Sequence, residues 1–384
     1  MYSQAQRRKI NLLYLIDTLC GEGGTENHLS YLARFINKDK FNCSIVAFDI
    51  GGSFVDSIRA SGINVYHIPL ARYYTPNTFT KFCELRKIIK ANMIDIVQTY
   101  HYKSDTFGVV TSRLSGVKHV ISSRRDIGDT KKRRHIVINK ICNKLIEHFI
   151  TVCDAVGERL KVDENVPESM QTTIYNGVDL NKYKLPDKDI IIRERRVLTI
   201  KESDFVIGYV ANFRPEKNHD VFFEALGRIK TEISELKVLV VGDGPTEENC
   251  KDYCRDNGLD NIVLFVGRKN DVRNYIAVMD VACLVPGSNE GFSNSILEKM
   301  AMGKPMIVTD VGGNTESVVD GENGIVIPPL NSQKLADAIM YLYKNPSIRE
   351  EMGRKSRERV EKYFALDKMI RDHELFYEQV LNTI

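Results

Sequence analysis

The stretch NEGFSNSILEKMAMGKPMIVTD, Asn289–Asp310, contains the repeating unit from which the fold can be inferred. A loop of small residues leads into a segment whose apolar residues recur every three or four positions, as on one face of a helix. We predict a helix that begins near Ser293 and ends at Gly303, because glycine readily adopts the conformation that ends helices. The apolar run at 305–309 then predicts a buried strand.

The same alternation of apolar strands and amphipathic segments extends over the whole chain. Runs rich in Val, Ile and Leu without alternation are typical of strands covered on both faces. Helices between such strands indicate βαβ units and parallel sheets. The predicted strands are 10–17, 43–48, 64–68, 94–100, 118–123, 148–152, 205–211, 236–242, 262–267, 281–285, 305–309 and 324–327. The sequence therefore predicts an α/β protein with two doubly wound domains.

A charged segment that contains Pro186 separates the two sets of strands. We predict a first domain at 1–181, a linker at 182–201 and a second domain at 202–366. The last segment, 367–384, has the apolar stripe of a helix and could pack back on the first domain. Ligands of open parallel sheets lie beyond the carboxyl ends of the strands, so two such domains facing each other would form a binding cleft.

Composition excludes several classes of protein. With 43% apolar and 27% charged residues, the 384-residue chain can bury two cores, and its net charge of +3 is too balanced for a nucleic-acid binder. Eight cysteines without a CxxC pair predict neither a metal site nor a disulfide framework and favour the reducing cytoplasm. The N-terminal apolar run is short and contains Asn11, so a buried strand is expected rather than a signal peptide. No apolar run is long enough to span a membrane.

Candidate binding residues follow two strands of the first half. Gly23 and Gly24 stand between a strand and a helix, where the backbone could approach a phosphate. A dinucleotide fingerprint needs a glycine at position 26, which is Glu26, and a plain glycine turn is the alternative. His101 follows the strand at 94–100 and could donate to a phosphate or a sugar hydroxyl, the alternative being an ordinary surface or core histidine.

Cationic and glycine residues follow two strands of the second half. Arg214 and Lys217 come after the strand at 205–211 and combine a planar fork with a point charge, which suits a diphosphate. Two solvated loop cations are the alternative. Gly267 and Arg268, at the end of the strand at 262–267, could present backbone groups to an aromatic base.

The opening stretch has one carboxylate before its helix and one within it. Gly291 and the small residues after it leave the helix N-terminus accessible to an anion. Glu298 falls beside the apolar stripe, and Glu290 precedes the helix by a few residues. A carboxylate next to an anion site is expected if it binds a hydroxyl or assists chemistry, and two exposed glutamates are the alternative.

Together these residues resemble the retaining GT-B glycosyltransferases of family 4 over nearly the whole chain. The most specific feature is a motif of Glu, seven residues and Glu, met by Glu290 and Glu298. Four more motifs occur in the family's order: GGTENHL at 23–29, NGVD at 176–179, RPEKNHD at 214–220 and VGDGP at 241–245. The resemblance implies two Rossmann-like domains facing across a cleft, and metal-independent sugar transfer from a nucleotide-sugar without a further cofactor.

The resemblance also implies roles for individual residues. Glu298 would hold the ribose hydroxyls of a donor linked to UDP or GDP, and Glu290 would take a catalytic or sugar-orienting role. Arg214 and Lys217 would stabilise the departing diphosphate. The other matched positions are Gly23 and Gly24 in the glycine loop, His101 near sugar and phosphate, and Phe292, Ser293 and Asn294 near diphosphate and sugar.

The first domain would bind the acceptor, by the same resemblance, and it contains a basic cluster before an apolar helix. Such a cluster could lie on anionic lipid, or it could be the solvated start of a core helix. Its members are Arg124, Arg125, Lys131, Lys132, Arg133 and Arg134. We expect a lipid-linked or saccharide acceptor, a role in surface polysaccharide or glycolipid biosynthesis, and a cytoplasmic enzyme that could sit on the inner face of the membrane.

Three other functions compete with this interpretation. A nucleotide-sugar epimerase of the same architecture would need a second acid–base pair, which the sequence does not offer. A nicotinamide oxidoreductase is disfavoured because no complete GxGxxG follows a strand. An inactive nucleotide-sugar-binding subunit is disfavoured by the presence of Glu290, Glu298, Arg214 and Lys217.

Overall fold

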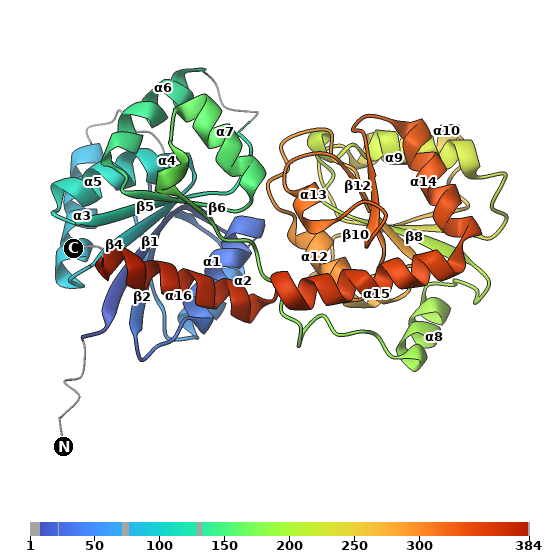
Figure 1. Ribbon diagram of the computed structural model, residues 1–384, viewed down its shortest axis with the longest axis horizontal. Coiled ribbons are helices and arrows are strands. Elements are labelled where there is room, and N and C mark those ends of the chain that lie inside the picture. The colour runs from blue at the N-terminus through green and yellow to red at the C-terminus, as the bar shows by residue number, and fades with distance from the viewer. Residues whose placement is uncertain (1–7, 22, 71–76, 129–132, 383–384) are drawn as a thin grey trace. The chain divides into compact units, whose positions relative to one another are not determined.

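A computed structural model describes residues 8–21, 23–70, 77–128 and 133–382 (Figure 1). Contacts between residues divide the chain into two compact units. Unit 1 consists of residues 1–175 and 367–384, and unit 2 of residues 176–366. Each unit is a parallel sheet with helices packed on its faces, so the predicted α/β class with two doubly wound domains is confirmed.

Unit 1 is built on a seven-stranded parallel sheet of order β3-β2-β1-β4-β5-β6-β7. Its strands are β1 (Ile10–Leu19), β2 (Phe41–Ile50), β3 (Asn64–His67), β4 (Ile96–Tyr100), β5 (His119–Arg124), β6 (His148–Thr151) and β7 (Gln171–Thr173). Its helices are α1 (Gly24–Phe35), α2 (Gly52–Arg59), α3 (Asn77–Ala91), α4 (His101–Lys103), the π-helix η1 (Ser104–Gly108), α5 (Val109–Leu114), α6 (Arg133–Cys142), η2 (Asn143–Leu145), α7 (Asp154–Glu164), η3 (Glu168–Met170) and α16 (Leu366–Asn382).

Unit 2 is built on a six-stranded parallel sheet of order β10-β9-β8-β11-β12-β13. Its strands are β8 (Phe205–Val210), β9 (Leu236–Val241), β10 (Val263–Gly267), β11 (Val281–Leu284), β12 (Met306–Thr309) and β13 (Gly324–Ile327). Its helices are α8 (Lys188–Val197), η4 (Pro215–Lys217), α9 (His219–Ile229), α10 (Glu247–Asp256), α11 (Arg273–Ala277), α12 (Asn294–Ala301), α13 (Asn314–Ser317), α14 (Ser332–Lys344) and α15 (Pro346–Tyr363).

All twelve predicted strands are present, and the central ones are apolar runs that are buried along their whole length. In β1 the residues from Leu12 to Ile16 are at most 1% exposed, and every residue of β8 is buried. The predicted helix of the opening stretch is α12, with Ser293 at its N-cap and Gly303 in the left-handed conformation at φ +69°. The three-residue strand β7 was not predicted, since its Gln-Thr-Thr sequence has no apolar signal.

The segment predicted as a linker belongs to unit 2 and contains helix α8. Arg195 fixes this helix, because its guanidinium donates to the carboxylate of Asp280 at 3.0 Å and to the carbonyl oxygen of Asp204 at 2.9 Å.

The C-terminal helix α16 belongs to unit 1 from Asp367 onward. There Tyr377 donates to the side-chain oxygen of Gln98, on β4, at 2.5 Å.

The strand order defines where ligands are expected to bind in each sheet. It reverses direction between β1 and β4 in unit 1, and between β8 and β11 in unit 2. Open parallel sheets bind ligands beyond the carboxyl ends of the strands at such a reversal.

Among the residues that the structure describes, no helix combines the length and the hydropathy that a membrane crossing requires.

Candidate functional site

In unit 2, the buried hydroxyl of Tyr209 ties together the two loops at the reversal point of the sheet. This hydroxyl donates to the carbonyl oxygen of Lys217 and accepts the backbone N–H of Val285, just after β11, at 3.2 Å. Burial raises the pKa of Tyr209 well above its ordinary value, so the hydroxyl stays protonated and can donate. The loop that carries Lys217 is therefore fixed beside the loop that leads to α12.

The two loops bring Lys217 and Glu290 into an ion pair. The Nζ of Lys217 lies 2.5 Å from Oε2 of Glu290, and the two side chains are only 21% and 11% exposed. Asn289, just before Glu290, has φ +52°, a left-handed conformation that asparagine tolerates better than most residues. The alternative of an exposed glutamate is thus wrong for Glu290, which is buried against a cation.

The loop between Glu290 and α12 is anchored by the backbone and by the NGVD motif. Asn176, the first residue of that motif, donates its side-chain amide to the carbonyl oxygen of Phe292 at 2.8 Å. The N–H of Gly313 donates to the carbonyl oxygen of Gly291 at 2.7 Å. Ser293 is the N-cap of α12, and its side chain makes no capping hydrogen bond to the first turn. That turn, with Asn294 as its first residue, starts beside the ion pair without a side-chain cap.

Glu298 lies in the middle of α12 and is partly buried. Burial raises the pKa of Glu298, against the opposing effects of the Lys299 ammonium group and a hydrogen bond with Tyr183. The positive charge of Lys182 acts in the same direction as these two groups. The carboxyl group is therefore surrounded by polar partners rather than by bulk water.

Lys299 was missed by the sequence reasoning and is fully buried, at 0% exposure. Its Nζ donates to the carbonyl oxygen of Ser295 at 3.0 Å and to the Ser295 hydroxyl at 2.5 Å. That hydroxyl donates in turn to the carbonyl oxygen of Val210 at 2.7 Å, which anchors α12 to the end of β8. A signal was available, because position 299 is three residues after the buried Ile296 and so falls on the core face of the helix.

Burial of Lys299 predicts a dependence of stability on pH. Burial lowers the pKa of Lys299 from 10.5 to about 8, while Glu298 and Glu290 oppose this change. Between these values the native state has lost the proton that the unfolded state keeps, so the free energy of unfolding rises with pH. Relative to Lys299→Met, the wild-type protein should gain up to about 3 kcal/mol from pH 8 to pH 10.5.

Urea unfolding of both proteins across this pH range measures that gain. Lys344→Met provides a matched control, because Lys344 is an exposed lysine at the end of α14 in the same unit. The free energy of unfolding of Lys344→Met should change with pH in the same way as that of the wild type. If Lys299→Met also shows the same pH dependence as the wild type, that result would contradict a buried ammonium group at position 299.

Among the other predicted residues of unit 2, the two arginines are exposed, Gly267 is half-buried and Phe292 belongs to the loop already described. Arg214 is the exposed N-cap of η4, directly before the turn that carries Lys217. Gly267 ends β10 with φ +71°, a conformation that favours glycine, and Arg268 after it is exposed. Phe292 is buried, with its ring centroid 5.1 Å from that of Phe364. Its burial leaves the backbone of the loop, rather than the Phe292 ring, to meet a ligand.

In unit 1, Glu26 stands where a dinucleotide fingerprint needs a glycine, and its side chain binds the backbone of the glycine loop after β1. Gly23 is the N-cap of α1 and Gly24 its first residue. The buried carboxylate of Glu26 accepts the backbone N–H groups of Cys20 at 3.2 Å and Gly23 at 3.3 Å. The Gly23 N–H is thus bound to a carboxylate of the protein in this structure.

His101 occupies a strained turn at the carboxyl end of β4. Its φ of +72° is unusual for a residue other than glycine, and the π-helix η1 begins three residues later, at Ser104. Asp17, on β1, holds this turn by accepting the N–H groups of Lys103 and Ser104, each at 2.8 Å. Burial raises the pKa of Asp17, against these hydrogen bonds and the nearby His101. The reversal point of unit 1 therefore presents His101 in a fixed conformation.

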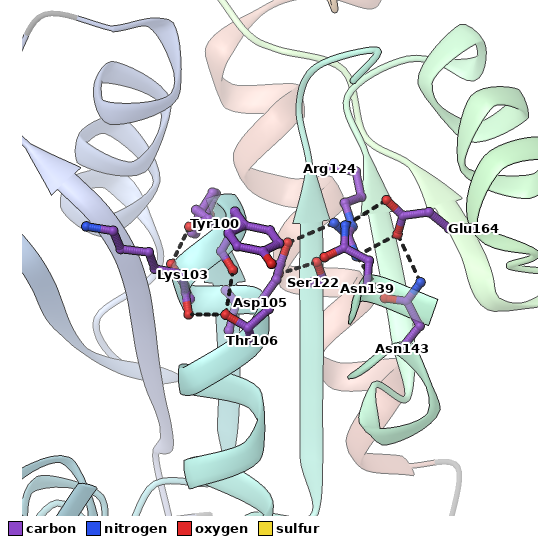
Figure 2. A network of polar contacts seen from close by, with 12 residues as sticks. Tyr100, Lys103, Asp105, Thr106, Ser122, Arg124, Asn139, Asn143 and Glu164 are labelled. Atoms are coloured by element: carbon purple, nitrogen blue, oxygen red, sulfur yellow. Dashed lines mark hydrogen bonds and ion pairs between the residues drawn. The ribbon is translucent and has the colours of Figure 1, made fainter. Parts of the chain in front are cut away.

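Arg124 does not belong to an exposed basic cluster, and this part of the prediction is wrong. It ends β5 and is 7% exposed, with a guanidinium nitrogen 2.9 Å from Asp105 and another 3.2 Å from Glu164. Figure 2 shows these three side chains joined in one polar network. Asn139 and Asn143 donate to Glu164 at 2.8 Å and 3.0 Å, so every partner of the buried cation is hydrogen-bonded.

The remaining members of the predicted basic cluster have different environments. Arg125 is partly buried, and burial lowers its pKa to about 10. Arg133 and Arg134 are exposed in the first turn of α6. Lys131 and Lys132 lie outside the described residues. Two arginines of the predicted cluster therefore face solvent in the described part of the chain.

Comparison with known proteins identifies both halves of the chain. A family model described as Glycosyl transferases group 1 matches residues 191–359, and one described as Glycosyltransferase Family 4 matches residues 22–182. An N-acetyl-alpha-D-glucosaminyl L-malate synthase of Bacillus anthracis is 31% identical over 54% of each chain. A UDP-Gal:alpha-D-GlcNAc-diphosphoundecaprenol alpha-1,3-galactosyltransferase of Escherichia coli is 26% identical over 78% of this chain and 79% of its own.

Solved structures show the same fold over nearly the full length of the chain. Anabaena Alr3699/HepE in complex with UDP superposes with a TM-score of 0.86 over 96% of this chain and all of its own, at 19% identity. A glycosyltransferase from Rickettsia africae gives a TM-score of 0.87 over 98% of this chain and all of its own, at 20% identity. At these identities the likeness concerns the fold.

Proposed function

Because the chain belongs to the GT-B glycosyltransferases, by its group 1 and family 4 domains, we propose that it transfers a sugar from a nucleotide-sugar to an acceptor and retains the anomeric configuration. The observation that carries this proposal is the buried Lys217–Glu290 ion pair beside the first turn of α12. A UDP-linked donor is the first choice and a GDP-linked donor the second, since the Escherichia coli relative is named for UDP-Gal and the Anabaena structure contains UDP.

Leaving-group stabilisation is the main task of this site. Cleavage of a sugar–phosphate bond leaves negative charge on the diphosphate, and fixed cations and a helix N-terminus can stabilise that charge without a metal ion. Lys217 is held by Tyr209 and by Glu290, and Arg214 stands three residues before it. As charge develops on the diphosphate, the Lys217 ammonium can hydrogen-bond to it while remaining next to Glu290.

The two glutamates take different roles in this proposal. Glu290, fixed by Lys217, orients the donor sugar through its second carboxylate oxygen. Glu298 binds the ribose hydroxyls, because a partly buried carboxylate with polar neighbours is a suitable acceptor for two hydroxyl donors. Gly267 and Arg268 supply the backbone for the base, and the loop from Phe292 to Asn294 meets the diphosphate.

The acceptor is proposed to bind unit 1, near His101, and to be lipid-linked. The name of the Escherichia coli relative describes an acceptor on diphosphoundecaprenol, and other relatives are named for capsular polysaccharide and O-antigen synthesis. The exposed Arg133 and Arg134 supply positive charge that could contact an anionic membrane. We therefore place the enzyme in surface polysaccharide or glycolipid biosynthesis, in the cytoplasm and peripheral to the inner face of the membrane.

An assay with a panel of UDP- and GDP-sugars tests this proposal, with EDTA present and with short lipid-phosphate-linked saccharides as acceptors. We expect release of one nucleoside diphosphate and, from an α-linked donor, an α-linked product by NMR. Conversion of the donor sugar without acceptor would instead establish an epimerase. Binding of a nucleotide-sugar without any turnover would establish an inactive binding subunit.

A further inference from the structure

Unit 1 contains an apolar cavity that the proposed chemistry at the two reversal points does not use. Its volume is about 480 Å³, within the range of sites that bind small molecules. Helices α3, α5 and α6 and the π-helix η1 contribute its walls, and five of its lining side chains are Phe79, Phe82, Phe107, Val110 and Ile138. A lining of this kind offers little to a polar ligand and suits a hydrocarbon.

Exposed apolar side chains lie at this cavity and on one of the helices that form it. Phe79 and Val110, which line the cavity, are 72% and 38% exposed. On α6, Val137 and Ile141 are 58% and 63% exposed, and each directly precedes a lining residue in the sequence. Scattered apolar residues on a surface need no explanation, but a group of them around an apolar cavity marks a binding surface. The combination indicates a ligand that continues out of the cavity across apolar protein surface.

Positive charge stands at one end of the same surface. Arg134, Ile138 and Cys142 are spaced by four residues and lie on one face of α6, and the last two line the cavity. Arg134 is exposed in the first turn of the helix, next to the exposed Arg133. An anionic group at Arg134 and a hydrocarbon along Ile138 and Cys142 would follow one helix face.

The cavity also adjoins the turn that carries His101. Tyr102, the next residue, lines the cavity and packs against His135 on α6, with ring centroids 4.5 Å apart. Thr106 and Phe107 of η1 line it as well. Because η1 follows the His101 turn and Asp17 fixes its start, the cavity wall and the candidate acceptor site share one segment of chain.

We propose that this cavity binds the hydrocarbon chain of a polyisoprenyl-phosphate-linked acceptor, with the phosphate at Arg133 and Arg134 and the saccharide directed toward His101. The proposal rests on the proposed function and specifies its acceptor. It is favoured over a folded protein partner because the cationic helix start matches a phosphate and the lining matches an unfunctionalised chain. A chain also brings no backbone polar groups into an apolar site.

Fluorescence can test the cavity directly, because the protein contains no Trp. Phe79→Trp, at the exposed rim, and Phe82→Trp, in the lining, each introduce a single reporter. Phe35→Trp is the matched control, since Phe35 is a 56% exposed phenylalanine on α1 of the same unit. Each variant is titrated with farnesyl phosphate below its critical micelle concentration. Separate titrations use inorganic phosphate and vesicles of phosphatidylcholine and phosphatidylglycerol.

We expect farnesyl phosphate to shift the emission of Phe79→Trp or Phe82→Trp to the blue in a saturable manner and to leave Phe35→Trp unchanged. Replacement of both Arg133 and Arg134 by serine should weaken this binding at least tenfold. A response to the vesicles without one to farnesyl phosphate would overturn the proposal in favour of a membrane-docking surface. Absence of any response would also overturn it, and a UDP-induced rise in melting temperature of the same variants would show that the donor site survives.

Discussion

Replacement of Lys217 by alanine should lower the rate of sugar transfer by about 10²–10³-fold, the usual loss when one group that stabilises developing charge is removed. In the native protein Lys217 is the direct partner of Glu290, and both side chains are largely buried. The substitution therefore removes a cation from the diphosphate and leaves Glu290 without the group that orients it. Both effects raise the barrier for departure of the nucleoside diphosphate.

Steady-state kinetics with the preferred donor measure this effect. The loss should appear mainly in kcat, because charge develops on the diphosphate in the transition state. Lys251→Ala is a suitable control, since Lys251 forms ion pairs with Glu247 and Glu248 in the same unit at the surface. It should retain the wild-type rate. A Lys217→Ala enzyme within threefold of the wild type would contradict the assignment of Lys217 to leaving-group stabilisation.

Replacement of Arg124 by alanine should destabilise unit 1 by about 3–5 kcal/mol, the cost of leaving buried carboxylates without their cation. The side chains of Arg124, Asp105 and Glu164 are 7%, 3% and 2% exposed, so the two carboxylates have little contact with bulk water. Thr99 and Ser122 also donate to Asp105, which leaves its carboxylate fixed in place. The expected effect is therefore one of stability.

Urea unfolding separates this effect from that of a surface pair. Lys161→Ala removes the cation of an exposed pair with Glu168 in the same unit and should leave the midpoint unchanged. A triple variant with Arg124→Met, Asp105→Asn and Glu164→Gln should recover part of the lost stability, because it removes the stranded charges with their partner. An Arg124→Ala protein as stable as Lys161→Ala would contradict a buried network.

The strands and α12 could be predicted because their signals are local. The run FVIGYV of β8 is almost wholly apolar and is buried along its length, and the stripe of α12 ends at a glycine with φ +69°. These inferences need only the period of the sequence and the geometry of a parallel sheet. The donor-binding roles of Glu290 and Glu298 rest instead on the family resemblance of their spacing, and they stay predictions.

The burial of Arg124 could not be predicted, because it depends on distant partners. Arg124 reads as a surface cation beside Arg125, but its partner Glu164 is 40 positions away on α7. For Lys299 a local signal existed, since position 299 falls on the core face of α12 and its partner Ser295 is four residues away. Glu26 also binds nearby groups, the backbone N–H groups of Cys20 and Gly23, but its sequence position shows only that the dinucleotide fingerprint is broken.

Thermal unfolding with UDP, GDP, ADP, CMP and NAD, on the wild type and on Glu298→Ala, tests nucleotide-sugar binding in unit 2 most directly. A ligand at roughly 100 times its dissociation constant adds about 2.7 kcal/mol to the free energy of unfolding. We predict that UDP or GDP raises the melting temperature of the wild type and of Glu322→Ala, an exposed glutamate in the same unit. Glu298→Ala should lose this rise. A rise with NAD alone, or an undiminished rise in Glu298→Ala, would contradict the proposed donor site.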